Sequence, residues 1–273
     1  MDFNTVELHV VRHPLKPPSR SPGYDVVAVH GLGGSREISW TTKDVFGQQV
    51  MWIKHLLPDY IEDPRVFAYD YTQGPQGDTV CLSVNVLKEL AVKLLKRLLS
   101  QSTEKDRSLV FVGHNFGGFI IKQALLLAVN SREYSTIAAK TSLMIFFSTP
   151  HRAVDMNSWE RMSCRMIFAT YQRWQGKASD MIDKSSRTLI ASSEDFQTIE
   201  RIYNILNVFE KRESSSTGSP PVIGRYAATL GVPNAESIGR EQTHLNICKF
   251  QSASDPVFQR VCKAIKTSKG EAS

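Results

Sequence analysis

Short runs of apolar residues alternate along this chain with longer segments in which apolar side chains recur at helical spacing. The clearest strand pattern covers residues 109–112, four apolar residues that include two β-branched valines. Residues 118–129 are apolar nearly all round, as expected of a helix buried against a sheet. Strands that alternate with helices in this way favour a mostly parallel sheet covered by helices. Since 273 residues, 41% of them hydrophobic, can bury one large core, we predict a single domain over residues 1–273.

Two helical segments have apolar faces that could serve more than one purpose. Residues 86–99 carry leucines at positions 87, 90, 94 and 98 on one face, which we predict to pack on the sheet, with an anionic membrane as the alternative. Over residues 155–200 the strand signals vanish, and we predict a helical insertion that caps the functional site. Its large apolar side chains would line a ligand pocket or pack onto the domain. They are Trp159, Met162, Met166, Ile167, Phe168, Tyr171 and Trp174.

The predicted strand at residues 109–112 leads into Gly113-His114-Asn115-Phe116-Gly117. This is the Gly-x-Ser-x-Gly nucleophile elbow in its usual place between a strand and a helix, with asparagine where serine is expected. The apex of such a turn has a positive φ, which asparagine tolerates better than most residues. Asn115 should therefore keep the turn intact. Its amide nitrogen cannot act as the nucleophile of serine-type acyl chemistry, because the lone pair is delocalised into the carbonyl group.

A nucleophile elbow works with an oxyanion hole made by two backbone N–H groups, one from the residue after the apex and one from a glycine-rich loop. Phe116 occupies the first position. Residues 25–29 are typical of a strand, and His30-Gly31-Leu32-Gly33-Gly34 follows as the loop, so we predict Leu32 as the second donor. The loop alone also suits an ordinary glycine turn or a phosphate-binding loop. Its pairing with an elbow about eighty residues later favours the oxyanion hole.

The acid and the histidine follow the nucleophile in this architecture, so the candidates lie beyond the elbow. Two histidines qualify. His151 directly follows a strand and is suited to bracing a loop, whereas His244 lies in a late polar loop before a predicted helix. We predict His244 as the base. The strand at residues 205–209 ends at Glu210, which we predict as the acid that fixes the imidazole tautomer, with Asp195 as the alternative.

Composition narrows the classes of function. The chain has 33 basic and 27 acidic residues, a net charge of +6, and no long basic run, so we predict no nucleic-acid binding. Its cysteines, at positions 81, 164, 248 and 262, have no Cys-x-x-Cys spacing and no suitably placed histidine, so we expect neither a metal site nor a cofactor. The N-terminal segment lacks a signal-peptide pattern and no apolar run approaches a membrane span, which predicts a cytoplasmic protein.

Together these motifs resemble the serine-active-site-containing, lipase-like family of α/β hydrolases, also found as the N-terminal domain of fungal NACHT-type proteins. The matching stretches are residues 27–34 with Trp40, 52–58, 65–71, 110–125, 146–153, 208–210 and 243–250, nearly the whole chain in order. The resemblance implies the α/β-hydrolase fold, with an eight-stranded and mostly parallel sheet, and the hydrolysis of lipid or other carboxylic esters. The family pattern places serine at position 115, the acid at 210 and histidine at 244. This chain departs from that pattern at position 115.

Asn115 leaves three functions open. A hydrolase fold that has lost ester hydrolysis would bind an acyl ester, a thioester, a lipid-like ligand or another partner without turnover. Alternatively, the natural parent is an active esterase, thioesterase or lipase, and Asn115 is an inactivating substitution. The third hypothesis is a lyase, isomerase or cyclase in which His244 acts as a general base while the oxyanion hole stabilises an enolate. We favour the first hypothesis, with the second close behind.

Overall fold

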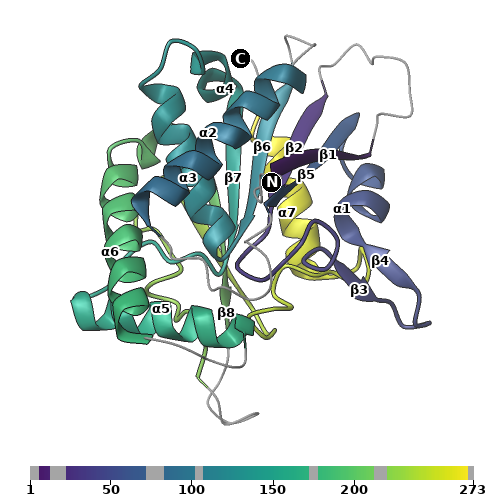
Figure 1. Cartoon of the computed structure of the whole chain (residues 1–273). Helices are drawn as coiled ribbons and strands as arrows, with labels where there is room; N and C mark the ends of the chain where they lie inside the picture. The colour runs from purple at the N-terminus through teal and green to yellow at the C-terminus, as the bar shows by residue number, and fades with distance from the viewer. Residues whose placement is uncertain are drawn as a thin grey trace, which may run out of the picture.

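The computed structural model describes residues 6–12, 23–71, 83–101, 107–171, 178–211 and 220–269. These residues form a seven-stranded sheet in the order β1-β5-β2-β6-β7-β8-β9, with helices packed against it (Figure 1). β1 (Val6–Arg12) pairs antiparallel with its neighbour β5, and the other pairings in the sheet are parallel. The other strands are β2 (Tyr24–Val29), β5 (Pro64–Tyr71), β6 (Ser108–His114), β7 (Thr141–Phe147), β8 (Asn204–Glu210) and β9 (Ala235–Arg240). The prediction of a mostly parallel sheet flanked by helices is confirmed.

The number of strands differs from the prediction, because the described sheet has seven strands and not eight. Two further strands, β3 (Thr41–Lys43) and β4 (Gln49–Met51), pair with each other as a separate antiparallel hairpin. Each of them is only three residues long, and their hydrogen bonds are made to one another. They therefore add no strand to the main sheet.

Both faces of the sheet are covered, and alternate residues of each central strand point to opposite faces. Val27 and Val29 of β2 pack in one cluster with helices α2 (Val84–Gln101) and α3 (Phe116–Val129). Val26 and Ala28, from the same strand, pack in a second cluster with α1 (Trp52–His55) and α7 (Pro256–Thr267). Because both faces of the strands are buried, the strands appear in the sequence as continuous apolar runs. The shorter elements are α4 (Ser135–Lys140), η1 (Leu57–Asp59) and η2 (Glu200–Ile202).

Helix α2 uses its leucine face for packing, as predicted. Leu87, Leu94 and Leu98 are buried in the first core cluster, and Leu90 packs against the edge of that cluster. The apolar face is therefore covered by protein and is not available for contact with a membrane. None of the helices in the described ranges combines the length and the apolar character needed to cross a bilayer.

Two helices occupy the predicted insertion at residues 155–200. They are α5 (Met156–Tyr171) and α6 (Ala178–Gln197). Four of the apolar side chains singled out in the sequence, Trp159, Met162, Met166 and Ile167, are buried in the first core cluster. Phe168 is 64% exposed. Trp174 and the side chain of Tyr171 lie outside the described residues. The buried members of this set therefore pack onto the domain, which is one of the two uses considered.

Candidate active site

The chain turns from β6 into α3 at a single residue, Asn115. Its φ of 50° and ψ of −118° form a backbone conformation that L residues rarely adopt. Hydrogen bonds hold this conformation from the side of β7. The N–H of Asn115 donates to the Phe147 carbonyl oxygen at 3.0 Å, and the Thr149 hydroxyl donates to the Asn115 carbonyl oxygen at 3.1 Å. The predicted elbow is thus present, with the carboxamide at its apex.

The glycine on the helix side of the elbow is required by the close approach of α3 to β2. A Cβ atom at Gly117 would lie 2.2 Å from the carbonyl oxygen of Val29 and 2.4 Å from that of His30. Because these atoms belong to the backbone, no change of rotamer would relieve the overlap. The absence of a side chain at position 117 therefore lets the N-terminus of α3 lie directly against the end of β2, where the predicted oxyanion loop begins.

The carboxamide of Asn115 contacts both the predicted base and a predicted oxyanion donor. Its Nδ2 donates a hydrogen bond to His244 Nε2, and its Oδ1 accepts one from the Phe116 N–H at 2.5 Å. Since Nε2 of His244 is an acceptor here, Nδ1 carries a proton. Nδ1 in turn donates to Glu210 Oε1 at 2.8 Å. Glu210, His244 and Asn115 are therefore joined by two consecutive hydrogen bonds.

Glu210 is almost fully buried and accepts several hydrogen bonds besides that of His244. Its donors include the Ser148 hydroxyl at 3.2 Å, the Val222 N–H at 3.0 Å and the Ile223 N–H at 3.3 Å. Burial by itself would raise the pKa of Glu210, but the hydrogen bond and charge of His244 and the two backbone donors outweigh it, so the pKa is lowered. The carboxylate is therefore ionised at neutral pH. Asp195, the alternative acid, lies on α6, and Glu210 is the carboxylate that meets the histidine.

Two further residues, His114 and Ser148, contact this group, although the sequence did not predict them as part of the site. His114 donates from Nε2 to the carbonyl oxygen of His244 at 3.0 Å, and the centres of the two rings lie 5.2 Å apart. Burial, followed by the charge of His244, lowers the pKa of His114 to about 3, so this ring stays neutral. Ser148, which has a φ of 43°, donates to Glu210. His114 adjoins the elbow in the sequence, but its contact with the His244 loop is visible only in three dimensions.

The glycine-rich loop after β2 lies against the elbow. Leu32, the second predicted oxyanion donor, is buried in this loop. A Cβ atom at Gly31 would lie 2.9 Å from Asn115 Cβ, so the loop passes directly over the apex. Thr170 of α5 donates to the Leu32 carbonyl oxygen at 3.4 Å, and its methyl carbon would lie 2.2 Å from a Cβ atom at Gly33, where φ is 63°. A helix of the predicted cap therefore contacts the loop that carries Leu32.

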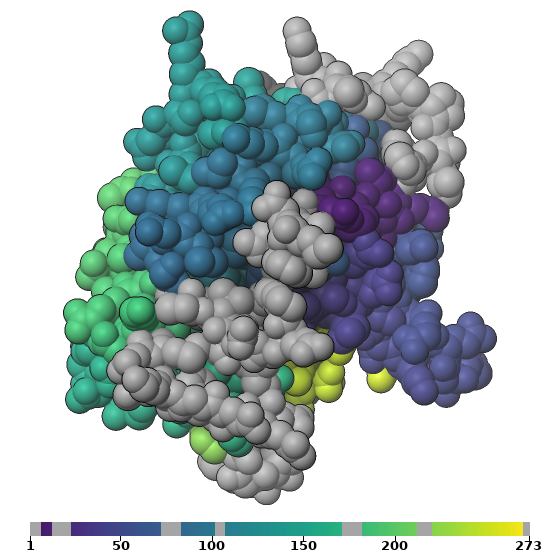
Figure 2. All heavy atoms as spheres, in the orientation of Figure 1, coloured from purple at the N-terminus to yellow at the C-terminus, as the bar shows by residue number. Residues whose placement is uncertain are grey.

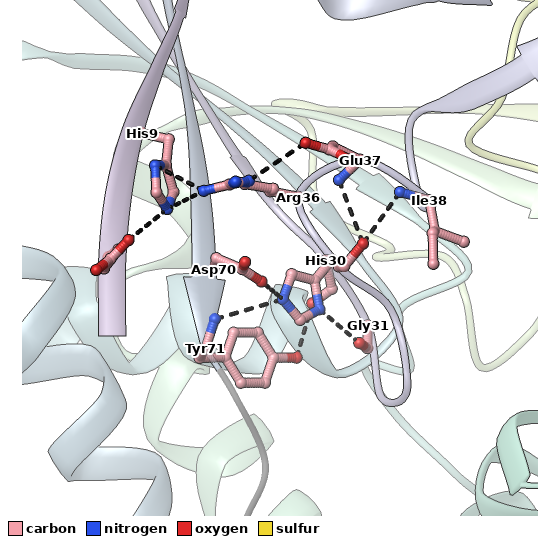
Figure 3. A network of polar contacts seen from close by, with 10 residues as sticks. His9, His30, Gly31, Arg36, Glu37, Ile38, Asp70 and Tyr71 are labelled. Atoms are coloured by element: carbon pink, nitrogen blue, oxygen red, sulfur yellow. Dashed lines mark hydrogen bonds and ion pairs between the residues drawn. The ribbon is translucent and has the colours of Figure 1, made fainter. Parts of the chain in front are cut away.

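A polar network holds the start of this loop in place (Figure 3). The ring of His30 faces the carbonyl oxygen of Gly31 at 2.8 Å through Nδ1 and Asp70 Oδ1 at 3.1 Å through Nε2. The same ring stacks on Tyr71, whose hydroxyl donates to the His30 carbonyl oxygen at 2.8 Å. The hydrogen bond from His30 is the main cause of the lowered pKa of Asp70. These contacts tie the glycine-rich loop to β5.

Within the described ranges, no three His, Cys, Asp or Glu side chains are placed to hold one ion. Cys164 is exposed, Cys248 and Cys262 are buried, and all three are free thiols, whereas Cys81 lies outside the described residues. Burial raises the pKa of Cys248 and of Cys262 to about 12, so neither buried thiol is ionised at neutral pH.

Comparisons with known proteins show the family of this chain. The family model described as "Putative serine esterase (DUF676)" matches residues 25–216. Protein SERAC1 of Danio rerio is 24% identical over 282 residues, and the alignment covers 95% of this chain and 41% of that protein. Protein SERAC1 of Homo sapiens is 25% identical over 276 residues, with 94% and 40% covered. The chain thus spans about two fifths of the length of these relatives.

Solved structures of lipases share the fold. A Bacillus licheniformis lipase, BlEst2, superposes with a TM-score of 0.55 at 16% identity, covering 94% of this chain and 98% of that one. A lipase described as putative, from Acinetobacter baumannii, has a TM-score of 0.55 at 15% identity, covering 98% of this chain and 89% of that one. At these identities the likeness shows the α/β-hydrolase fold, and the chemistry has to be argued from the site itself.

Proposed function

The chain belongs to the family described as "Putative serine esterase (DUF676)", and from this we propose that it binds a carboxylic ester, a thioester or a lipid-like acyl compound and is impaired in hydrolysing it. The proposal treats Asn115, Glu210 and His244 as the triad positions, with Phe116 and Leu32 as the oxyanion donors. The proposed location is cytoplasmic. It is supported by the sequence pattern alone.

One observation carries the proposal, namely the position of the Asn115 carboxamide. Its nitrogen donates a hydrogen bond to His244 Nε2, the atom that would remove the proton of a serine nucleophile. Its oxygen accepts a hydrogen bond from the Phe116 N–H, the group that would stabilise the oxyanion of an acyl intermediate. The amide therefore supplies no nucleophile and also competes with the substrate for a donor. The hydrogen bond between His244 and Glu210 supports their proposed roles as base and acid.

The test is the substitution Asn115→Ser. A serine hydroxyl is shorter than the carboxamide, so it would free the Phe116 N–H while lying within reach of His244. We expect Asn115→Ser to hydrolyse short p-nitrophenyl esters at least about a thousandfold faster than the parent chain, because loss of the nucleophile from such a site costs up to about a millionfold in rate. The measurement is kcat/KM on a series of acyl esters and thioesters.

Two controls make the result specific. Asn115→Ala also frees the Phe116 N–H but adds no hydroxyl, so this variant should bind the ester without hydrolysing it. Asn115→Ser combined with His244→Ala should lose the gained activity, because the serine would then lack its base. If Asn115→Ser stays as inactive as Asn115→Ala, while both remain folded, the proposed triad is wrong.

The remaining hypotheses differ in what they require of the site. The reading in which Asn115 inactivates an active parent makes the same prediction for Asn115→Ser, and the geometry is compatible with it. A lyase, isomerase or cyclase that uses His244 as a general base needs Nε2 available to its substrate. In the structure that atom is held by the Asn115 amide, which favours the esterase-type proposal.

A further inference from the structure

The hairpin of β3 and β4 ends in an exposed apolar pair. Figure 2 shows this segment, coloured dark blue, as a projection from the right side of the molecule. The side chains at its tip, Val45 and Phe46, are 85% and 84% exposed, the two highest values among the large hydrophobic residues of the described chain. A single exposed apolar residue needs no explanation, but two adjacent ones at the end of a projection point to a contact outside the molecule.

The turn is built to hold this pair outward. Asp44 Oδ1 accepts hydrogen bonds from the Phe46 N–H at 2.9 Å and from the Gln48 N–H at 2.8 Å. The backbone of Asp44 also bonds to Gln48 and to Gly47, at 2.9 Å and 3.1 Å, and Gly47 has a φ of 81°. Because Asp44 Oδ1 bonds to two backbone N–H groups of the turn, Val45 and Phe46 stand on a preformed loop.

The charges beside the tip suit a negatively charged partner. Lys43 is exposed at the end of β3, directly before the turn, and the half-buried Lys249 lines the same pocket as Thr42 of β3. Neither lysine makes an ion pair with any described residue, and the acidic residue beside Lys43 is Asp44, which bonds within the turn. Two apolar side chains bury too little area for a specific protein interface, which needs about 1,000 Å². They are enough for shallow insertion among lipid headgroups, where basic residues add attraction to anionic lipids.

The hairpin is also joined to the predicted site. The indole N–H of Trp52, directly after β4, donates to the Cys248 carbonyl oxygen at 2.8 Å, and the Cys248 thiol donates to the Ser39 carbonyl oxygen at 3.2 Å. Cys248 lies four residues after His244. Thr42 of β3 lines a polar pocket of about 270 Å³ together with residues of the segment that carries His244. The root of the hairpin therefore packs against the segment that carries His244.

From these contacts we propose that Val45 and Phe46 insert into the surface of a bilayer that contains anionic phospholipid. Lys43 and Lys249 would then face the headgroups, and the His244 end of the sheet would be held close to acyl-lipid substrate. Only this last consequence rests on the proposed function. Binding to the bilayer itself requires no catalysis, so it can fail or succeed independently of Asn115→Ser.

The test measures co-sedimentation of the whole chain with vesicles of phosphatidylcholine containing phosphatidylglycerol. We expect the double variant Val45→Ser, Phe46→Ser to bind at least about tenfold more weakly, because both inserted apolar side chains are removed. Lys43→Gln should weaken binding to these vesicles and leave binding to pure phosphatidylcholine unchanged. The matched control is Ile202→Ser, which removes a 61% exposed apolar side chain just before β8, outside the hairpin.

A second measurement reports insertion directly. In Phe46→Trp, lipids brominated on their acyl chains should quench the added tryptophan beyond the quenching seen in the parent chain. The proposal is overturned if the parent chain does not bind the vesicles, if the serine variant binds as well as the parent, or if Ile202→Ser loses binding equally. A change in oligomeric mass on substituting the tip, without any vesicle binding, would assign the surface to a protein contact instead.

Discussion

At the residue scale, Asn115 keeps the backbone of a nucleophile elbow and changes what the elbow can do. Its positive φ, its backbone hydrogen bond to Phe147 and the neighbouring glycines are those that a serine at this position would need. Its side chain, in contrast, is both a donor to His244 and an acceptor for Phe116. One carboxamide thereby satisfies two buried polar groups that an esterase leaves for the nucleophile and the substrate.

Lys122 is a second residue whose surroundings change its chemistry. It is buried in α3, and its ammonium group donates to the Pro150 carbonyl oxygen at 2.8 Å and lies 4.5 Å from the ring centre of Phe119. Burial lowers the pKa of this amine from 10.5 to about 7, although the charge of Glu200 acts in the opposite direction. Between these two pKa values the folded protein binds one proton fewer at Lys122 than the unfolded chain does.

Stability should therefore depend on pH through Lys122. Below about pH 7 the amine is protonated in both the folded and the unfolded state, and burying its charge destabilises the folded protein most. As pH rises from there toward the pKa of the unfolded chain, this destabilisation becomes smaller. We expect the gain in the free energy of unfolding of Lys122→Met over the parent to be largest near pH 7. That advantage should shrink by up to about 1.4 kcal/mol per pH unit above it.

Urea unfolding at about pH 7, 8 and 9 measures how the stability difference between Lys122→Met and the parent changes with pH. The matched control is Lys88→Met, which makes the same substitution at an exposed position of α2. A difference between Lys122→Met and the parent that stays constant across the window would show that Lys122 titrates normally in the folded protein.

At the element scale, the contact between α3 and β2 sets the position of the site. We expect Gly117→Ala to lower the free energy of unfolding by about 2 to 3 kcal/mol, because its Cβ atom would overlap the backbone oxygens of Val29 and His30. Gly224→Ala is the matched control. A Cβ atom there would have no neighbour within 4 Å, so the change should stay within about 0.5 kcal/mol.

Chemical denaturation of the two variants decides this prediction. Equal stabilities would mean that α3 can shift away from β2 without loss. In the Asn115→Ser background, Gly117→Ala should also reduce esterase activity, because a shift of α3 moves the Phe116 N–H relative to His244.

The elements differed in how well the sequence predicted them. Strands β6 and β8 and helices α2 and α3 follow directly from apolar runs and helical periodicity, because each buries one or more faces in a core cluster. The hairpin of β3 and β4 gave no such signal. Its strands are three residues long, largely solvent-accessible and stabilised mainly by each other, so no periodic apolar pattern marks them.

At the scale of the whole molecule, the two core clusters lie on opposite faces of one sheet and share its strands. The predicted cap is part of the same arrangement, since Trp159 and Met166 of α5 belong to the cluster that contains α3. Neither cluster can lose its packing without exposing the sheet. We therefore expect one cooperative unfolding transition, in accordance with the prediction of a single domain.

Differential scanning calorimetry tests this expectation through the ratio of the calorimetric to the van 't Hoff enthalpy, which should be close to one. The same scan on the Val45→Ser, Phe46→Ser variant should give an unchanged midpoint, because neither side chain packs in the core. A separate early transition would show that α5 and α6 unfold independently, and would contradict the single-domain prediction.

The sequence by itself indicated the local parts: the strand-turn-helix around Asn115, the glycine loop, and His244 as the candidate base, with the acid left between Glu210 and Asp195. Such features depend on neighbours in the chain, so short patterns reveal them. The tertiary structure decided which distant groups meet. It brought Glu210 rather than Asp195 to His244, placed His114 under the His244 loop, and turned the Asn115 amide toward the Phe116 N–H. Those contacts follow from the strand order and from side-chain packing, which no single segment encodes.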